Sequence, residues 1–188
     1  MKGADGLVKV SPGFLLLAAA LYFLGGGPAL TAFFTASLAH ELGHLAAMAL
    51  CGAWIGELRL TGAGLVIRYG GDLTPRQEAG IAAAGPLAGV LFALGCFLSR
   101  RPFFIYSGAI ALLASFFNLL PALPLDGGRL ALYALSSVMP EPAARRALRV
   151  TGSLCALGAA ATGIAVRSPA AAAAGIWLLV LANAPDLG

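Results

Sequence analysis

Long uncharged stretches separated by short polar segments set the pattern of this chain. Lys, Arg, Asp and Glu are absent from residues 11–39, 81–99, 102–125 and 170–185. Each stretch approaches or exceeds the roughly 17–25 residues that a helix needs to cross about 30 Å of hydrocarbon. Only 11% of residues are charged, against about 25% in a soluble domain. With a mean hydropathy of +0.89, the chain is predicted to be one polytopic, α-helical membrane domain spanning residues 1–188.

Glycine and proline divide this apolar sequence into about six membrane-spanning helices. The cluster Gly25-Gly26-Gly27-Pro28 ends the first helix, because glycine and proline interrupt helices more firmly than other residues. Thr74 and Pro75 are a typical N-cap and first position of a later helix. The predicted spans are 13–24, 29–51, 75–98, 103–120, 150–166 and 170–183, with a shorter helical piece at 130–138.

The first apolar run follows Lys2 and Lys9 in the manner of a signal peptide. It leads into further apolar helices, and we therefore interpret it as a retained first span.

A short β-prone region lies between the second and third predicted spans. Residues 54–60 and 65–69 are partly alternating and rich in β-branched or aromatic side chains, and glycines at 62 and 64 separate them. This pattern predicts a β-hairpin or small sheet at the membrane face, closed by a turn at 70–72.

Charge indicates how the chain is oriented. With six spans and the N-terminus inside, nine of the 12 basic residues lie on the cytoplasmic side and three outside. The positive-inside bias therefore favours a multi-pass protein of the cell membrane with both termini in the cytoplasm. The same bias accounts for the net charge of +4, so that no nucleic-acid partner is needed. The cytoplasmic set is Lys2, Lys9, Arg59, Arg68, Arg76, Arg129, Arg145, Arg146 and Arg149, and the outer set is Arg100, Arg101 and Arg167.

The two histidines of the chain, His40 and His44, stand four residues apart inside the second predicted span. On a helix, residues i and i+4 share one face, and two imidazoles so placed can bind one tetrahedral Zn²⁺. Glu41 lies one residue round the helix, within reach of a water at the metal without being a ligand. This is the HExxH arrangement of zinc hydrolases. The alternative is a pair of buried core histidines beside a carboxylate.

A second polar stretch follows the fourth predicted span, from Asn118 to Arg129, with prolines at 121 and 124. Prolines three residues apart cannot continue a regular helix. Irregular backbone at membrane depth requires protein burial or a watery cavity, and Asp126 in such a place indicates a functional site. Asp126-Gly127-Gly128 is also ordinary turn chemistry, so a surface turn stays an equal alternative. Cys51, Cys96 and Cys155 show no CxxC spacing and are predicted to be buried thiols rather than a disulfide framework.

Taken together, the HExxH helix, the Gly85-Pro86 pair and the NxxPxxPxDGG segment at 118–128 resemble the site-2 protease family of intramembrane zinc metalloproteases. The resemblance covers nearly the whole chain. It implies a six-helix membrane fold in which Asp126 is the third zinc ligand beside His40 and His44. Asn118 would match the family's asparagine near the catalytic water or substrate. The short form, without a PDZ or CBS domain, is most similar to the sporulation-type branch. Gly89 stands where the family often has asparagine.

The family resemblance implies a zinc metalloendopeptidase that cuts a peptide bond in or near the transmembrane segment of a membrane-bound substrate. Glu41 would be the general base, and Asn118 would either stabilise the oxyanion or hold the broken segment. One alternative is a zinc-binding pseudoprotease or membrane scaffold, which predicts a replaced catalytic carboxylate, whereas Glu41 is present. A metal transporter would need polar residues in several spans, and the other spans have almost none. The expected partners are the lipid bilayer, a membrane-protein substrate and a regulatory membrane partner.

Overall fold

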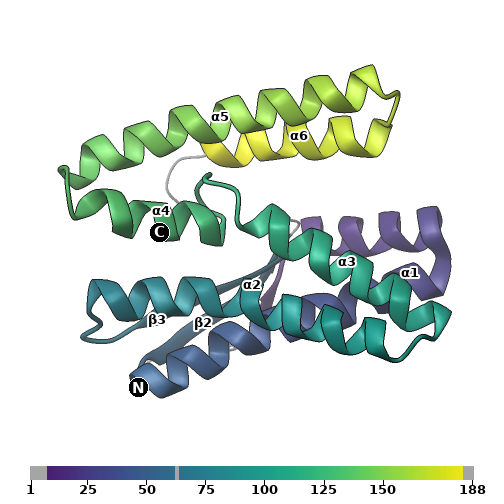
Figure 1. Cartoon of the computed structure of the whole chain (residues 1–188), viewed down its shortest axis with the longest axis horizontal. Helices are drawn as coiled ribbons and strands as arrows, with labels where there is room; N and C mark the ends of the chain where they lie inside the picture. Colours follow the sequence, from purple (N-terminus) through teal and green to yellow (C-terminus); the bar gives the residue numbers. More distant parts are fainter. Residues whose placement is uncertain (1–7, 62–63, 184–188) are drawn as a thin grey trace. The chain divides into compact units, whose positions relative to one another are not determined.

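The computed structural model describes residues 8–61 and 64–183, and most of these residues are helical (Figure 1). The chain divides into two compact units, Met1–Ser115 and Phe116–Gly188. The predicted fold class, helical with a small sheet, is confirmed. The elements in chain order are β1 (Val8–Val10), α1 (Pro12–Cys51), β2 (Trp54–Thr61), β3 (Gly64–Gly70), α2 (Pro75–Leu98), α3 (Pro102–Asn118), α4 (Asp126–Ser136), α5 (Glu141–Ala165) and α6 (Pro169–Asn183).

In the first unit, α1 turns back on itself at the glycine cluster. Gly26 has non-helical angles, φ 70° and ψ −170°, inside an otherwise helical segment. The rings of Phe14 and Phe34 lie 5.7 Å apart, centroid to centroid. In a straight helix, positions 14 and 34 would be about 30 Å apart. α1 is therefore a helical hairpin, and the predicted break between the first two helices is confirmed.

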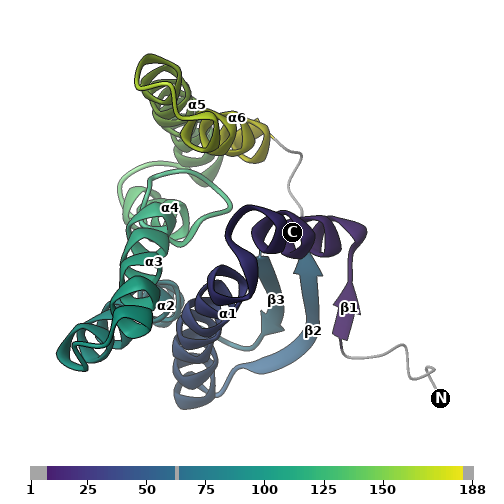
Figure 2. The ribbon, with the colours of Figure 1, turned by 90° about the vertical axis from the view of Figure 1, so that its right-hand side faces the viewer.

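A three-stranded sheet of order β1-β2-β3 accompanies this hairpin (Figure 2). β2 and β3 are antiparallel, from Trp54 opposite Gly70 to Thr61 opposite Gly64, which confirms the predicted hairpin. The residues at its turn, 62–63, lie outside the described residues. Sequence reasoning missed β1, which pairs in parallel with β2 and ends where Ser11 N–H donates to the carbonyl of Leu60 across 2.8 Å. A three-residue strand gives too short a pattern to be detected.

The start of α2 is fixed by a capping box. Thr74 Oγ1 accepts a hydrogen bond from Gln77 N–H at 3.3 Å, and Gln77 Oε1 accepts from Thr74 N–H at 2.9 Å. Pro75 occupies the first turn, where its missing N–H costs nothing. The predicted N-cap and helix bounds are confirmed. Further along, α1, α2 and α3 pack through a cluster of small side chains, Ala36, Ala93 and Ala111.

The second unit contains the end of α3, an irregular segment at 119–125, and helices α4, α5 and α6. α5 and α6 lie side by side (Figure 2). Their backbones approach closely, because a Cβ on Gly163 would lie 2.2 Å from Ala172 N and one on Gly175 would lie 2.3 Å from Ala160 N. A core of Ala122, Leu125, Ala156 and Leu178 joins the irregular segment to this pair.

One predicted helix start in this unit was wrong, because the piece expected at 130–138 begins at Asp126. The basic stretch at 141–149, for which the sequence allows either a loop or a helix start, is the first part of α5. Among the described residues, α2 and α5 are long and apolar enough to cross a membrane, and residues 12–23, 102–118 and 171–180 form shorter apolar helices. The number of membrane spans therefore stays a prediction.

Candidate metal centre

His40 and His44 project from one face of the second arm of α1, as their spacing predicted. Both side chains are buried, with 8% and 6% of their surface exposed. Their ring centroids are 4.9 Å apart at an interplanar angle of 77°. The two Nε2 atoms are separated by 3.2 Å. The imidazoles thus converge through their Nε2 atoms instead of packing face to face.

This separation suits a shared zinc ion. Two nitrogens at about 2.0–2.1 Å from one tetrahedral Zn²⁺ lie roughly 3.3–3.4 Å apart. The observed 3.2 Å between the two Nε2 atoms needs only a small adjustment to reach that value. A hydrogen bond between the two Nε2 atoms also accounts for this distance, so the histidine pair alone does not distinguish the two interpretations, and the third candidate ligand decides between them.

The other nitrogen of His44 is held by α2. Nδ1 lies 2.7 Å from the carbonyl oxygen of Ile81. A carbonyl only accepts, so Nδ1 carries the proton and donates it. In the neutral ring this leaves the lone pair on Nε2, the atom nearest His40. Metal-binding histidines commonly have such a second partner, which fixes tautomer and ring orientation.

Gly85 and Pro86 lie directly after this contact on α2, and both are buried. Glycine in a helix interior costs roughly 0.5–1 kcal/mol relative to alanine, and proline costs about 3 kcal/mol or more. In the sequence the Gly85-Pro86 pair was part of the family resemblance. Its contact with a predicted zinc ligand was not foreseen.

Asp126 is the first residue of α4 and only 8% exposed. A carboxylate in the first turn is favoured by the helix dipole. A Cβ on Gly127 would lie 2.1 Å from Leu119 O, and one on Gly128 would lie 2.4 Å from the carbonyl carbon of Ala122. Residues 119–125 therefore fold closely against the start of α4, and only glycine fits at both positions. The alternative of an exposed Asp-Gly-Gly turn is wrong, because all three residues are buried.

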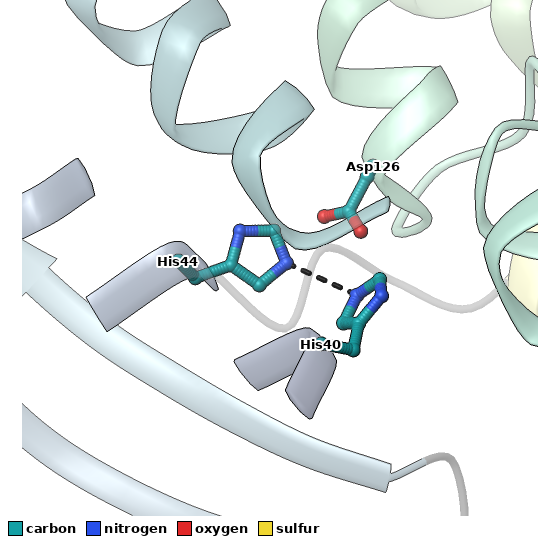
Figure 3. A group of neighbouring side chains, drawn as sticks. All are labelled: His40, His44 and Asp126. Atoms are coloured by element: carbon teal, nitrogen blue, oxygen red, sulfur yellow. Dashed lines mark hydrogen bonds between the residues drawn. The ribbon is translucent and has the colours of Figure 1, made fainter. Parts of the chain in front are cut away.

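Within the described part of the chain, His40, His44 and Asp126 form a buried group able to hold a metal ion (Figure 3). Their ligand atoms all lie within 4.8 Å of one another. Two imidazole nitrogens and one carboxylate oxygen are a zinc donor set that leaves a fourth position open, as catalytic sites require. The predicted zinc cofactor is therefore compatible with the residues present.

Glu41 and Asn118 are the other two predicted site residues. Glu41 is half-buried beside His40 in α1 and is not part of the metal-compatible group. Asn118 is the last residue of α3 and is also half-buried. Their roles stay predictions. The three cysteines are free thiols, as predicted, but the prediction that all are buried was wrong, because only Cys96 is buried and Cys51 and Cys155 are partly exposed.

Comparison with known proteins agrees with this geometry. No family model matches the chain. A protein named "Putative zinc metalloprotease Rip3", from two strains of Mycobacterium tuberculosis, is 34% identical over 85% of this chain. The site-2 protease from Methanocaldococcus jannaschii has the same fold, with a TM-score of 0.77, 19% identity, and coverage of 96% of this chain and 93% of that one. The chain therefore has the fold of a site-2 protease and is similar over most of its length to a protein named as a zinc metalloprotease.

Both comparisons support the resemblance drawn from the motifs, and the buried His-His-Asp group is compatible with zinc binding. The chain spans 44% of the length of the Rip3 relatives. Its similarity to the sporulation-type branch stays a prediction.

Proposed function

We propose that this protein is a member of the site-2 protease family, an intramembrane zinc metalloendopeptidase that hydrolyses a peptide bond in or near the transmembrane segment of a membrane-bound substrate. The observation that carries the proposal is the buried group of His40, His44 and Asp126, with Glu41 next to the first histidine. The similarity to a protein named as a zinc metalloprotease supports the same reaction class.

We propose that the domain is embedded in the cell membrane by about six helices, with both termini in the cytoplasm. Large apolar side chains that are more than 80% exposed occur at Phe23, Leu50 and Leu98. Soluble monomers rarely expose extended apolar surface, and a lipid environment explains it. The helices α2 and α5 meet the length and hydropathy needed to span a bilayer.

In this proposal His40, His44 and Asp126 hold one Zn²⁺. Bound there, the ion would lower the pKa of a coordinated water to about 7 and polarise the scissile carbonyl. His44 keeps its Nδ1–H on Ile81 O during the reaction, which holds Nε2 in its ligand orientation. Burial of the group excludes bulk water and strengthens electrostatic interactions inside it.

Glu41 is the proposed general base. Its carboxylate would take a proton from the attacking water and return it to the leaving amine, a role that typically contributes 10²–10⁴-fold to the rate. Asn118 is proposed to donate from its side-chain amide to the developing oxyanion or to hold the end of α3 in place. A neutral amide is cheaper to bury than a charged donor.

The proposed substrate is a membrane protein whose helix unwinds near the metal, because hydrolysis needs an extended backbone. The outer edge of β3 is a candidate for strand addition by that segment, and its alternative role is to cover the cytoplasmic entrance. A zinc-binding scaffold without catalysis is not favoured, since Glu41 and the metal-compatible group are both present.

The direct test is cleavage of single-span membrane substrates by the purified protein reconstituted in lipid, with and without a zinc chelator. Cleavage should stop with the chelator and resume when zinc is restored. Glu41→Gln should abolish cleavage while zinc stays near one per chain. If the Glu41→Gln variant still cleaves the substrate, Glu41 is not the general base. If cleavage by the wild-type protein persists after zinc is removed, the protein is not a zinc metalloprotease.

A further inference from the structure

The ring of His44 lies on the backbone of Gly85. A Cβ added to Gly85 would lie 2.1 Å from Nε2, 2.5 Å from Cε1 and 2.7 Å from Cδ2 of His44. These similar distances to Nε2 and its two bonded carbons place the added atom above the ring face and not along the lone pair. Alanine at position 85 would therefore push the whole imidazole away instead of filling a gap beside it.

The same ring is held at its edge one helical turn earlier. The carbonyl of Ile81 accepts the hydrogen bond from Nδ1, and residues 81 and 85 share one face of α2 because they are four apart. One residue fixes the edge of the ring, and the other supplies the surface beneath it. Together they determine the rotation of the ring and which nitrogen carries the proton.

We propose that Gly85 and the carbonyl of Ile81 form a seat for His44, and that Gly85 is a positioning residue for zinc binding. The proposal rests on the metal-binding part of the proposed function and not on proteolysis. An imidazole displaced from this seat would lose its Nδ1 partner and point Nε2 away from His40.

Other glycines of α2 provide matched comparisons. Gly89 is equally buried, but an added Cβ there would lie 2.2 Å from Ser115 Oγ on α3 and would not touch a histidine. Gly95 has no heavy atom within 4 Å of an added Cβ. Gly89→Ala therefore measures the effect of disturbed helix packing without a direct clash with a histidine. Gly95→Ala measures the effect of an additional methyl group in the helix where no neighbour is close.

The experiment measures zinc affinity by chelator competition for the wild-type protein, Gly85→Ala, Gly89→Ala and Gly95→Ala in the same detergent. Loss of a partner that orients a metal ligand typically costs 10–100-fold in affinity, and Gly85→Ala should fall in that range. Gly95→Ala should bind zinc as the wild type does. Gly89→Ala should lower the unfolding temperature but change zinc affinity less than threefold.

The absorption spectrum of the cobalt-substituted protein is a second measurement, and its shape does not depend on the overall stability of the protein. The visible absorption bands of bound Co²⁺ should change in shape in Gly85→Ala, because the ligand geometry changes, and should keep their shape in Gly89→Ala. If Gly85→Ala binds zinc as tightly as the wild type and keeps the cobalt spectrum unchanged, Gly85 does not position His44. Equal losses of zinc affinity in Gly85→Ala and Gly89→Ala would also contradict the proposal.

A measurement on the wild-type chain covers the case in which Gly85→Ala does not fold. The chain has two histidines, so ¹⁵N-histidine labelling yields signals from two rings, and the loss of one set in His40→Ala assigns them. In the metal-free protein, His44 should be the Nδ1–H tautomer. An Nε2–H tautomer at His44 would contradict the seat, whereas a wild-type protein that binds no zinc would contradict the proposed function instead.

Discussion

Nε2 of His40 lies 3.2 Å from Nε2 of His44, and the helix α1 holds the two rings in this arrangement one turn apart. The spacing leaves room for one ion between two nitrogens and is too short for two ions bound separately. In the proposed site the pair supplies two ligands of a single ion, and Asp126 is the proposed third ligand.

Asp126→Asn tests the source of that ligand. The amide keeps the shape of the carboxylate but loses its charge, so zinc affinity should fall at least tenfold while the fold is retained. Chelator competition on the purified variant measures the change. Asp72→Asn is the matched control, because Asp72 is exposed in the turn before α2. Wild-type zinc affinity in Asp126→Asn would remove this residue from the ligands.

Gly26→Ala should destabilise the α1 hairpin. Gly26 combines φ 70° with ψ −170°, a backbone region populated essentially by glycine alone, and holding a residue with a Cβ there costs on the order of 1–3 kcal/mol. Gly27→Ala is a close control, because its added Cβ meets no atom within 4 Å. Thermal unfolding in detergent should show a lower midpoint for Gly26→Ala than for Gly27→Ala. Equal midpoints would mean that the reversal does not depend on Gly26.

Tyr69→Phe should loosen the sheet from α2. The Tyr69 hydroxyl donates to Glu78 Oε2 across 2.6 Å, joining β3 to the first turn of α2. Removing a hydrogen bond to a carboxylate costs about 1–2 kcal/mol at a half-exposed site. Hydrogen exchange should become faster across β3, with zinc content unchanged. Tyr106→Phe, on the exposed face of α3, should leave exchange in β3 unaltered. Unchanged exchange in Tyr69→Phe would show that this contact does not anchor the strand.

The sheet should also respond to acid through Glu57. Hydrogen bonds from Lys9 and then Arg59 lower the pKa of this carboxyl from its ordinary value of 4.5. A lowered pKa means that the ionised form is favoured in the folded state. Its contribution is therefore fully present above pH 4.5 and is lost as the pH falls through the lowered value.

Lys9 Nζ lies 3.1 Å from Glu57 Oε1 and ties β1 to β2. Hydrogen exchange of these strands should accelerate below pH 4.5, after correction for intrinsic rates, more in the wild type than in Glu57→Gln. Glu141→Gln on α5 serves as control, since its partner Arg145 belongs to the same helix. An identical acid response in wild type and Glu57→Gln would exclude this origin.

Local patterns predicted much of the fold. The break at Gly26, the β2–β3 hairpin and the capping box at Thr74 each depend on a few adjacent residues with strong conformational preferences. β1 was missed because its pairing with β2 joins residues about 50 positions apart. The start of α4 at Asp126 was missed because prolines and glycines nearby indicate a turn, whereas glycine is needed here for close packing.

The candidate site was also predicted only in part. Residue types and spacing were enough to identify two histidines on one helix face and the acid of a proline-broken segment as candidates. The seat of His44 was not, because a backbone carbonyl carries no residue-type signal. The Gly85-Pro86 pair was the available signal, and it does not identify His44 as the residue that packs against it.

X-ray absorption at the zinc edge of the purified protein tests the central claim most directly. The account predicts one zinc per chain, surrounded by nitrogen and oxygen at about 2.0–2.1 Å with two imidazoles in the first shell. Sulfur at about 2.3 Å, which the three cysteines could supply, or a protein without zinc, would contradict it.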